Sequence, residues 1–315
     1  MAAAKPVRVG SSDLEVFPLV LGGNVFGWTA DEAATFAVLD AFAAAGGTML
    51  DTADAYSAWA PGHTGGESET LIGRWLARRG RRDDVVIATK VSQHPSFRGL
   101  AATNVRAAAQ ASLQRLGTDR IDLYYAHFDD ASVPLEETAG AFSALVDDGL
   151  VRYVAVSNYT PERLDEWLAV SDREGFHRPV ALQPQYNLLE RGFEGALRER
   201  AERHGLGVLP YYWLARGFLA GKYRDGGAPV DSPRAEAAAR YLDDRGRRVL
   251  AALDEVAAAH QVPVASVALA WLRMQPTVVA PIASARTCDQ LVDLLASASL
   301  ALTPDEVAAL SAASA

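Results

Sequence analysis

Short apolar runs alternate with amphipathic stretches along almost the whole chain. In the amphipathic stretches, apolar residues recur three or four positions apart, which is typical of helices with one buried face. At 31–45, for example, Phe36, Leu39 and Phe42 lie on one face. This pattern predicts helices over 31–45, 67–79, 103–116, 135–148, 161–171, 193–204, 245–260, 264–275 and 289–297, and a last helix that begins at Thr303. We expect Thr103 and Thr303 to cap the helices that they precede or open.

Eight short apolar runs lie between these helices and predict strands. They are 19–23, 48–51, 85–90, 121–127, 151–157, 180–186, 207–212 and 278–282. The run Val85-Val86-Ile87-Ala88 is apolar throughout, which is typical of a parallel sheet covered on both faces. Before the first run, 7–17 predicts a hairpin that turns at Ser11-Ser12-Asp13.

Eight successive strand-helix units predict an α/β fold, a (β/α)₈ TIM barrel with an N-terminal β-hairpin under its floor and extra helices. Length alone would suggest about two domains. Because no shift in composition marks a boundary, we expect one domain over 1–315. A doubly wound open sheet is the alternative, but no G-x-G-x-x-G follows any of the predicted strands.

Composition narrows the class of protein. The chain has 315 residues, 50% of them hydrophobic, and a formal net charge of −9, which disfavours a nucleic-acid partner. Its single cysteine, Cys288, excludes an intrachain disulfide. No apolar run approaches the roughly 20 residues of a membrane span, and 1–10 does not resemble a signal peptide. We therefore expect a cytoplasmic protein with no membrane partner. Histidines and acids show no metal-ligand spacing, so we expect no metal.

Ionisable residues end three consecutive predicted strands. Asp51, Lys90 and His127 hold these positions, and Tyr56 follows Asp51 by five residues. Active sites of such barrels lie at the carboxyl ends of the strands. The four side chains are therefore expected to converge. Taken singly, Asp51 could be a loop acid, Tyr56 a loop aromatic and His127 a core histidine.

Together these four residues suit the protonation of a carbonyl group. A lysine ammonium beside Tyr56 would favour the phenolate and lower the tyrosine pKa, so that Tyr56 could transfer a proton near neutral pH. Asp51 would compensate the buried charge of Lys90. His127 could orient the carbonyl oxygen. None of them can supply hydride, so a nicotinamide cofactor is required.

Several stretches resemble the aldo-keto reductase superfamily, most of all the bacterial oxidoreductases of the group that also contains potassium-channel β-subunits. These stretches are Leu-Asp-Thr-Ala-Asp-Ala-Tyr at 50–56, Ile-Ala-Thr-Lys at 87–90, Asp-Leu-Tyr-Tyr-Ala-His at 122–127, Val-Ser-Asn-Tyr at 156–159, Gln-Pro-Gln-Tyr-Asn at 183–187 and Arg-Gly-Phe-Leu-Ala-Gly-Lys-Tyr at 216–223.

The resemblance implies NADPH-dependent reduction of aldehydes or ketones. It makes Tyr56 the proton donor, Lys90 and Asp51 its tuning pair, and His127 the residue that orients the carbonyl. The partner would be a small aldehyde, ketone or sugar. Two other functions stay open: a cofactor-sensing binding module like a channel β-subunit, and a polyol or sugar dehydrogenase working in the oxidative direction. The oligomeric state is not readable.

The resemblance also implies an extended NADP molecule across the barrel mouth. Ser157, Asn158 and Gln183 would hold the nicotinamide carboxamide, and Tyr211 would stack on the ring. Arg286 suits a 2′-phosphate, which favours NADP over NAD. The segment 216–244 would close over the cofactor or form a disordered connector. The other cofactor candidates are Gly23, Asn24, Tyr212, Leu214, Arg216, Gly217, Lys222, Arg224, Ile282, Ser284 and Gln290.

Aromatic residues follow the first four predicted strands and could line an apolar substrate pocket. Packing within the loops is an equally good interpretation of each of them. These residues are Trp28, Trp59, His94, Phe97 and Phe128.

Overall fold

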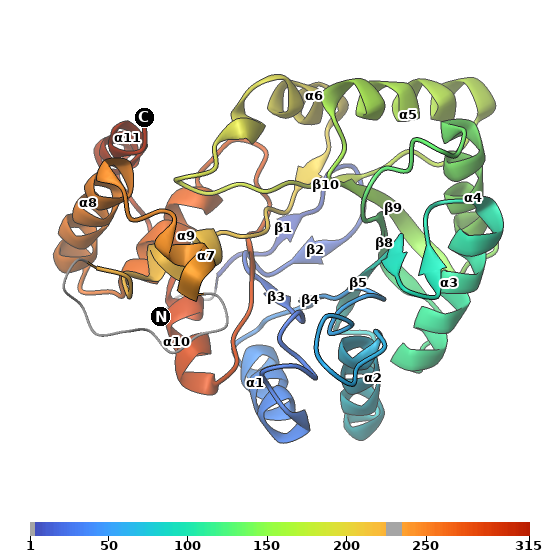
Figure 1. Cartoon of the computed structure of the whole chain (residues 1–315), viewed down its shortest axis with the longest axis horizontal. Coiled ribbons are helices and arrows are strands. Elements are labelled where there is room, and N and C mark those ends of the chain that lie inside the picture. Colours follow the sequence, from blue (N-terminus) through green and yellow to red (C-terminus); the bar gives the residue numbers. More distant parts are fainter. Residues whose placement is uncertain (1–3, 225–234) are drawn as a thin grey trace.

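The fold is a parallel barrel surrounded by helices. A computed structural model describes residues 4–224 and 235–315 (Figure 1). In this part of the chain, eight parallel strands form one sheet in the order β11-β10-β9-β8-β5-β4-β3-β12. Their bounds are β3 (Val20–Gly22), β4 (Met49–Asp51), β5 (Val86–Val91), β8 (Ile121–Ala126), β9 (Val151–Ser157), β10 (Ala181–Gln183), β11 (Gly207–Val208) and β12 (Ile282–Ala283).

Backbone hydrogen bonds join the two ends of this sheet. Val208 pairs with Val278 in an isolated parallel bridge. The Val208 amide donates to the Thr277 carbonyl at 3.0 Å, and the Ile282 amide donates to the Pro210 carbonyl at 2.9 Å. The predicted TIM barrel is therefore confirmed, and the doubly wound open sheet is wrong.

Helices follow the strands and cover the outside of the barrel, as Figure 1 shows. They include the ten predicted helices, with ends shifted by up to three residues. Their bounds are α1 (Glu32–Ala44), α2 (Glu67–Arg79), α3 (Ala102–Leu116), α4 (Leu135–Asp147), α5 (Pro161–Glu174), α6 (Ala196–His204), α8 (Asp244–His260), α9 (Val264–Arg273), α10 (Cys288–Ala296) and α11 (Pro304–Ala313).

Helix caps follow the prediction in one case and not in the other. Thr303 forms a capping box with Glu306 at the start of α11. Thr103 lies inside α3, whose N-cap is Ala101 and has no side-chain capping bond. The prediction of a Thr103 cap is wrong because the N-cap position lies two residues earlier, at Ala101, so that Thr103 is already part of the helix.

Several strands are shorter than predicted, and prolines explain this. Pro184, Pro210 and Pro281 lie in the runs predicted for β10, β11 and β12. A proline has no amide hydrogen to donate to the neighbouring strand. Accordingly β10 ends at Gln183, β11 ends at Val208, and β12 begins after Pro281.

The predicted hairpin is present and fills the amino-terminal end of the barrel. β1 (Val7–Arg8) pairs antiparallel with β2 (Glu15–Val16). Val9, Leu14 and Val16 pack against inward-facing residues of the barrel strands, which are Val20, Met49, Ala88, Leu123, Tyr125, Ala155, Ala181 and Leu209. Gly10 has φ +54°, and a Cβ there would lie 2.1 Å from the Val180 carbonyl oxygen.

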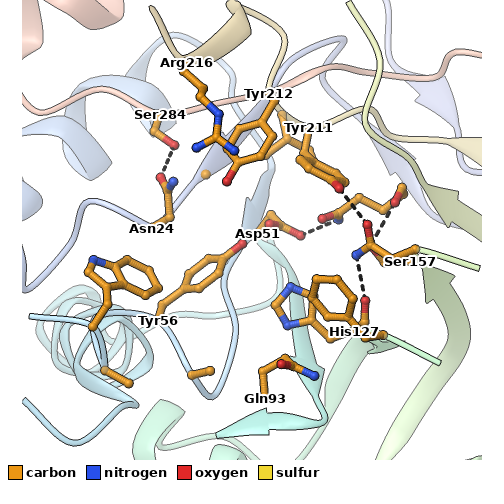
Figure 2. Close-up of a pocket in the computed structure, with 18 of the residues that line it drawn as sticks. Asn24, Asp51, Tyr56, Gln93, His127, Ser157, Tyr211, Tyr212, Arg216 and Ser284 are labelled. Atoms are coloured by element: carbon orange, nitrogen blue, oxygen red, sulfur yellow. Dashed lines mark hydrogen bonds between the residues drawn. The ribbon is translucent and has the colours of Figure 1, made fainter. Parts of the chain in front are cut away.

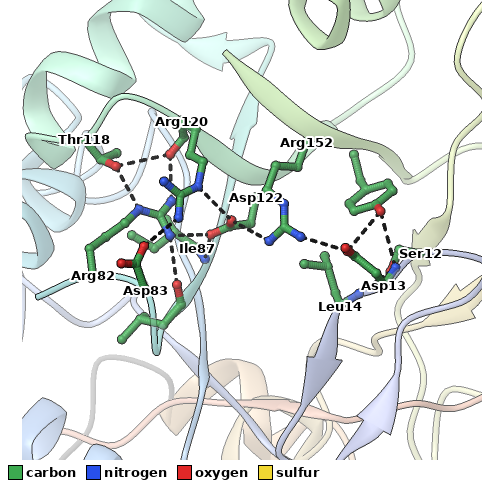
Figure 3. A network of polar contacts seen from close by, with 12 residues as sticks. Ser12, Asp13, Leu14, Arg82, Asp83, Ile87, Thr118, Arg120, Asp122 and Arg152 are labelled. Atoms are coloured by element: carbon green, nitrogen blue, oxygen red, sulfur yellow. Dashed lines mark hydrogen bonds and ion pairs between the residues drawn. The ribbon is translucent and has the colours of Figure 1, made fainter. Parts of the chain in front are cut away.

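A polar network fastens the hairpin to the same end of the barrel (Figure 3). Buried Asp122, on β8, accepts hydrogen bonds from the Ile87 amide and the Arg82 guanidinium, both at 2.8 Å. Arg152, on β9, bridges Asp122 at 3.2 Å and Asp13 of the hairpin at 2.8 Å. With this end closed, the opposite end is left for a binding site.

The segment predicted to close over the cofactor is only partly described. It contains the 3₁₀ helix η2 (Ala215–Ala220) and the short helix α7 (Ala235–Ala239); another 3₁₀ helix, η1 (Gly192–Glu194), precedes α6. Positions 225–234 lie outside the described residues, so the prediction for them is not tested. Among the described helices none is by itself long and apolar enough to cross a membrane; α8 and α9 reach that length only together, with a 98° bend between them.

Candidate active site

A cavity of about 600 Å³ opens at the carboxyl ends of the strands. A second cavity of about 230 Å³ adjoins it, and both are lined by Trp213, Leu214, Arg216, Gly217 and Ser284. We call the two adjoining cavities together the groove. Figure 2 shows Tyr56, His127 and Gln93 on one side of the larger cavity and Tyr211, Tyr212 and Arg216 across from them.

The four residues predicted to be catalytic converge at this cavity. Lys90, fully buried, donates from Nζ to Asp51 Oδ2 at 2.6 Å, to the Thr52 carbonyl at 2.7 Å and to Tyr56 Oη at 3.0 Å. These three acceptors match the three hydrogens of an ammonium group. His127 lies beside Tyr56, with 6.3 Å between the ring centroids. Tyr56, His127 and Asp51 line the cavity, and Lys90 lies beneath it.

The charges in this cluster are set by burial and by the ion pair. Burial lowers the Lys90 pKa, and the Asp51 carboxylate opposes that shift. Burial, together with the positive charge of Lys90, brings the His127 pKa well below its ordinary value. His127 is therefore a neutral imidazole near pH 7. Its Nδ1 is buried and has no hydrogen-bond partner among the described residues.

Hydrogen-bonding side chains from three strands form a polar wall next to this cluster. Ser157 Oγ donates to the Gln183 carbonyl at 2.8 Å, and Gln183 Nε2 donates to Asp51 Oδ1 at 2.9 Å. Asn158 Nδ2 donates to the His127 carbonyl at 2.9 Å, and the Tyr211 hydroxyl donates to Asn158 Oδ1 at 2.6 Å. Burial raises the pKa of Tyr211 to about 12, so this phenol stays protonated.

The loop after β11 has unusual backbone conformations. Tyr212, Ala215 and Arg216 have φ values of +56°, +47° and +62°, in the left-handed region that non-glycine residues seldom adopt. Such residues cost about 1–3 kcal/mol each and concentrate at functional sites. The Arg216 guanidinium lies over the Tyr212 ring, 4.8 Å from its centroid. This loop holds its cationic and aromatic groups at the junction of the two cavities.

Three cations of the groove have no acidic partner among the described residues. Arg216 lines both cavities, and Lys222 and Arg286 line the smaller one together with Gln290. The smaller cavity also contains one acid, Asp293. Cations that form no ion pair with a described residue and line a cavity suit an anionic ligand.

Most of the other candidate cofactor residues also line the groove. Asn24 lies in the larger cavity, and its Oδ1 accepts a hydrogen bond from Ser284 Oγ at 2.6 Å. Further candidates that line the larger cavity are Ser157, Asn158, Gln183, Tyr211, Tyr212, Leu214, Gly217 and Ile282.

Two cofactor candidates lie elsewhere. Arg224 lines neither cavity, because its guanidinium makes two hydrogen bonds of 2.7 Å with Asp254. Gly23 packs under the strand end, where a Cβ would lie 2.7 Å from Ser68 Oγ; Gly22 lines the cavity instead.

The aromatic candidates for the substrate pocket divide between positions. Trp59 and Phe128 line the larger cavity, and Trp28 lines the smaller one. His94 and Phe97 line neither cavity; their rings pack together with 5.2 Å between centroids. They lie on β6 (Gln93–His94) and β7 (Phe97–Arg98), a hairpin after β5. Because successive side chains of a strand point to opposite faces, Gln93 and Arg98 lie at the cavity instead of His94 and Phe97.

Sequence reasoning missed several lining residues. Gln93 and Arg98 could have been found from the two-residue Pro95-Ser96 turn, because it fixes the hairpin and hence which residues share a face. The other missed residues of the larger cavity, which carry no ionisable group, are Gly22, Ala55, Ala58, Pro95 and Trp213. The missed residues of the smaller cavity are Val25, Thr29, Ala220, Tyr223, Pro263, Ala265, Asp293 and Leu294.

Comparisons with known proteins point to one family. The model of the Aldo/keto reductase family matches residues 18–315. The chain is 34% identical to "Protein tas" of Escherichia coli (strain K12), over 97% of this chain and 96% of that protein. It is 32% identical to "Probable voltage-gated potassium channel subunit beta" of Oryza sativa subsp. japonica, over 91% of this chain and 88% of that protein. It is 31% identical to "Norsolorinic acid reductase B" of Aspergillus parasiticus, over 95% of this chain and 81% of that protein.

Proposed function

Since the chain belongs to the aldo/keto reductase family, we propose that it is an NADPH-dependent oxidoreductase that reduces aldehydes or ketones to alcohols. The observation that carries this proposal is the buried Lys90 ammonium, hydrogen-bonded at once to Asp51 and to Tyr56 Oη at the cavity wall. A neutral histidine next to that phenol completes a site for a carbonyl oxygen.

The groove has the chemistry that a dinucleotide requires. Ser157, Asn158 and Gln183 supply amide and hydroxyl groups for the nicotinamide carboxamide, and Tyr211 supplies an aromatic ring next to them. Arg216 and Lys222 would meet the diphosphate, and Arg286 the 2′-phosphate that distinguishes NADP from NAD. When bound, the reduced nicotinamide supplies the hydride that no side chain can supply.

The side chains would perform the proton half of the reaction. Tyr56 transfers its hydroxyl proton to the carbonyl oxygen as the carbonyl carbon receives hydride, so that C=O becomes CH–OH. The Lys90 ammonium stabilises the phenolate that remains on Tyr56. Asp51 keeps Lys90 charged and in position. A neutral His127 can donate one hydrogen bond to the same carbonyl oxygen without competing as an acid.

The test is NADPH consumption with a panel of aldehydes, ketones and sugars, with NADH in parallel. Tyr56→Phe is expected to lower turnover by about 10²-fold or more, because the proton donor is lost. Quenching of protein fluorescence by NADPH is expected to persist in this variant. Tyr153→Phe is the matched control, since the Tyr153 hydroxyl bonds to Asp13 at the other end of the barrel.

Two results would contradict the proposal. Unchanged turnover in Tyr56→Phe would exclude Tyr56 as the donor. Tight NADPH binding with negligible turnover over the whole panel would instead favour a cofactor-sensing binding module. A cytoplasmic location and a single domain over 1–315 stay predictions.

A further inference from the structure

The β6–β7 hairpin presents two different faces. Gln93 lies opposite Arg98 in its register, and His94 lies opposite Phe97. Directly opposed residues of antiparallel strands project to the same side. Gln93 and Arg98 therefore share one face, and His94 and Phe97 share the other.

The His94 and Phe97 face anchors the hairpin. The His94 side chain is buried, and its ring lies so close to Gly65 that a Cβ there would come within 2.7 Å of it. The Ser96 amide donates to His94 Nδ1 at 3.0 Å, which ties the turn to this ring. Because this face is fixed, the Gln93 and Arg98 face is held at the larger cavity, which both residues line.

Arg98 brings an uncompensated positive charge to that cavity. It forms no ion pair with any residue in 4–224 or 235–315. The larger cavity is lined by one carboxylate, that of Asp51, which already pairs with Lys90 at 2.6 Å. Of the three cations assigned above to the cofactor, Lys222 and Arg286 line only the smaller cavity, and Arg216 lies where the two cavities meet. Arg98 instead shares the end of the groove that holds Tyr56 and His127.

Aromatic side chains flank the reacting residues at this end. The Trp59 ring lies 6.0 Å from Tyr56, and the Phe128 ring lies 5.0 Å from His127. Both are large exposed hydrophobic side chains, with 51% and 41% of their surface accessible. Exposed aromatic rings beside a cavity favour contact with an apolar ligand.

Resting on the proposed reductase function, we infer that the substrate is a carbonyl compound with an apolar, aromatic body and a carboxylate, and that Arg98 binds the carboxylate. The body contacts Trp59 and Phe128 while the carbonyl oxygen meets Tyr56 and His127. A guanidinium matches a carboxylate through two parallel hydrogen bonds, and the Gln93 amide can add a third. Arg98 thereby determines specificity.

The experiment compares two aldehydes that differ in one charge. 4-Formylbenzoate carries a carboxylate, and its methyl ester is neutral with the same aromatic aldehyde. We measure kcat/KM for both with NADPH in the wild type and in Arg98→Gln, Arg98→Lys and Arg8→Gln. Arg8 is an exposed arginine on β1, at the closed end of the barrel, and serves as the matched control.

The expected result is a change in the ratio of the two kcat/KM values. Arg98→Gln should lower the preference for the carboxylate over the ester by about tenfold, the size of one charge-assisted interaction. Arg98→Lys should retain part of it, and Arg8→Gln should leave it unchanged. Added salt should reduce the preference in the wild type and leave it flat in Arg98→Gln. An equal ratio in wild type and Arg98→Gln would overturn the inference.

Failure of the reductase proposal would look different. In that case the wild type reduces neither aldehyde. Binding of 4-formylbenzoate, followed by intrinsic tryptophan fluorescence, then tests Arg98 alone. Weaker binding of 4-formylbenzoate to Arg98→Gln than to Arg8→Gln would support the assignment of Arg98 to the carboxylate. Equal binding to both variants would overturn that assignment.

Discussion

At the scale of single residues, Lys90 and Asp51 depend on each other. Both side chains are buried, and each would be an isolated charge without the other. Removing one member of a buried ion pair costs far more than the pair contributes when intact. The same contact that positions Tyr56 is therefore also a stability determinant.

Lys90→Met is expected to lower the free energy of unfolding by about 3–5 kcal/mol, because Asp51 stays buried and uncompensated. The double variant Asp51→Asn, Lys90→Met should recover a large part of that loss while remaining inactive. Urea unfolding followed by circular dichroism measures both. Equal destabilisation of the single and double variants would show that the charge of Asp51 is not the cause.

The convergence of the ionisable residues was the most predictable part of the site. Asp51, Lys90 and His127 lie at or next to the ends of neighbouring strands, so the barrel alone brings them together. Which side a residue faces was harder to predict. His94 and Phe97 were candidates for the cavity because of their aromatic rings, with packing within the loop as an equal alternative, and the hairpin register directs Gln93 and Arg98 to the cavity. A shift of one residue along a strand changes its face, and composition does not report it.

At the scale of elements, the β1–β2 hairpin depends on one close approach. Gly10 sits against the strand ends at Val180 and Gly207, where a Cβ would lie 2.1 and 2.7 Å from backbone atoms. Neither neighbour can move without disturbing the barrel. Gly117 has nearly the same φ, +62°, but open space around the position of its Cβ.

Gly10→Ala is expected to lower the free energy of unfolding by about 3 kcal/mol or more, through the left-handed backbone and the backbone clash together. Gly117→Ala should cost only about 1 kcal/mol, through the backbone conformation alone. Thermal unfolding of the two variants separates the cost of the backbone clash from the cost of the left-handed backbone conformation. A similar melting temperature for both would mean that the hairpin does not need this contact.

The order and kind of elements followed from periodicity, whereas their ends did not. Helix α2 was predicted at its observed limits, and in the structure Gly66 and Gly80 cap its two ends. Strands β10 and β11 were predicted too long because the predicted runs continue past Pro184 and Pro210, whereas the continuous pairing ends before these prolines and only isolated bridges follow. Hydrophobicity reports burial, and pairing additionally requires amide hydrogens.

At the scale of the whole molecule, charge is unevenly distributed. The chain carries a net charge of −9, yet Arg98, Arg216, Lys222 and Arg286 line the groove without an acidic partner among the described residues. The cofactor candidates chosen from the sequence included Arg224 as well, which pairs with Asp254 thirty positions away. Ion pairs between residues far apart in the sequence decide which cations remain available to bind a ligand. The spacing of residues along the sequence does not reveal such pairs.

Arg286→Gln is expected to raise the Kd for NADPH by about tenfold while the Kd for NADH changes little, because only NADPH carries a 2′-phosphate. Arg224→Gln is the matched control and should leave both values unchanged. Fluorescence titrations at two salt concentrations measure the effect, which should shrink at the higher one. An equal loss of affinity for both cofactors would place Arg286 away from the 2′-phosphate.

The barrel closes through β11 and β12, two strands of two residues each, while β8 and β9 on the far side have six and seven. Opening transitions in a protein begin where the backbone has the fewest hydrogen bonds to lose. The backbone pairing between Val208 and Val278 is therefore expected to open first, and amide hydrogens there should exchange with solvent before those in β8. Tyr211 and Ser284 follow these two strands and line the same cavity. A ligand that contacts both residues would hold β11 and β12 together. Binding would therefore stabilise the part of the barrel that opens most easily.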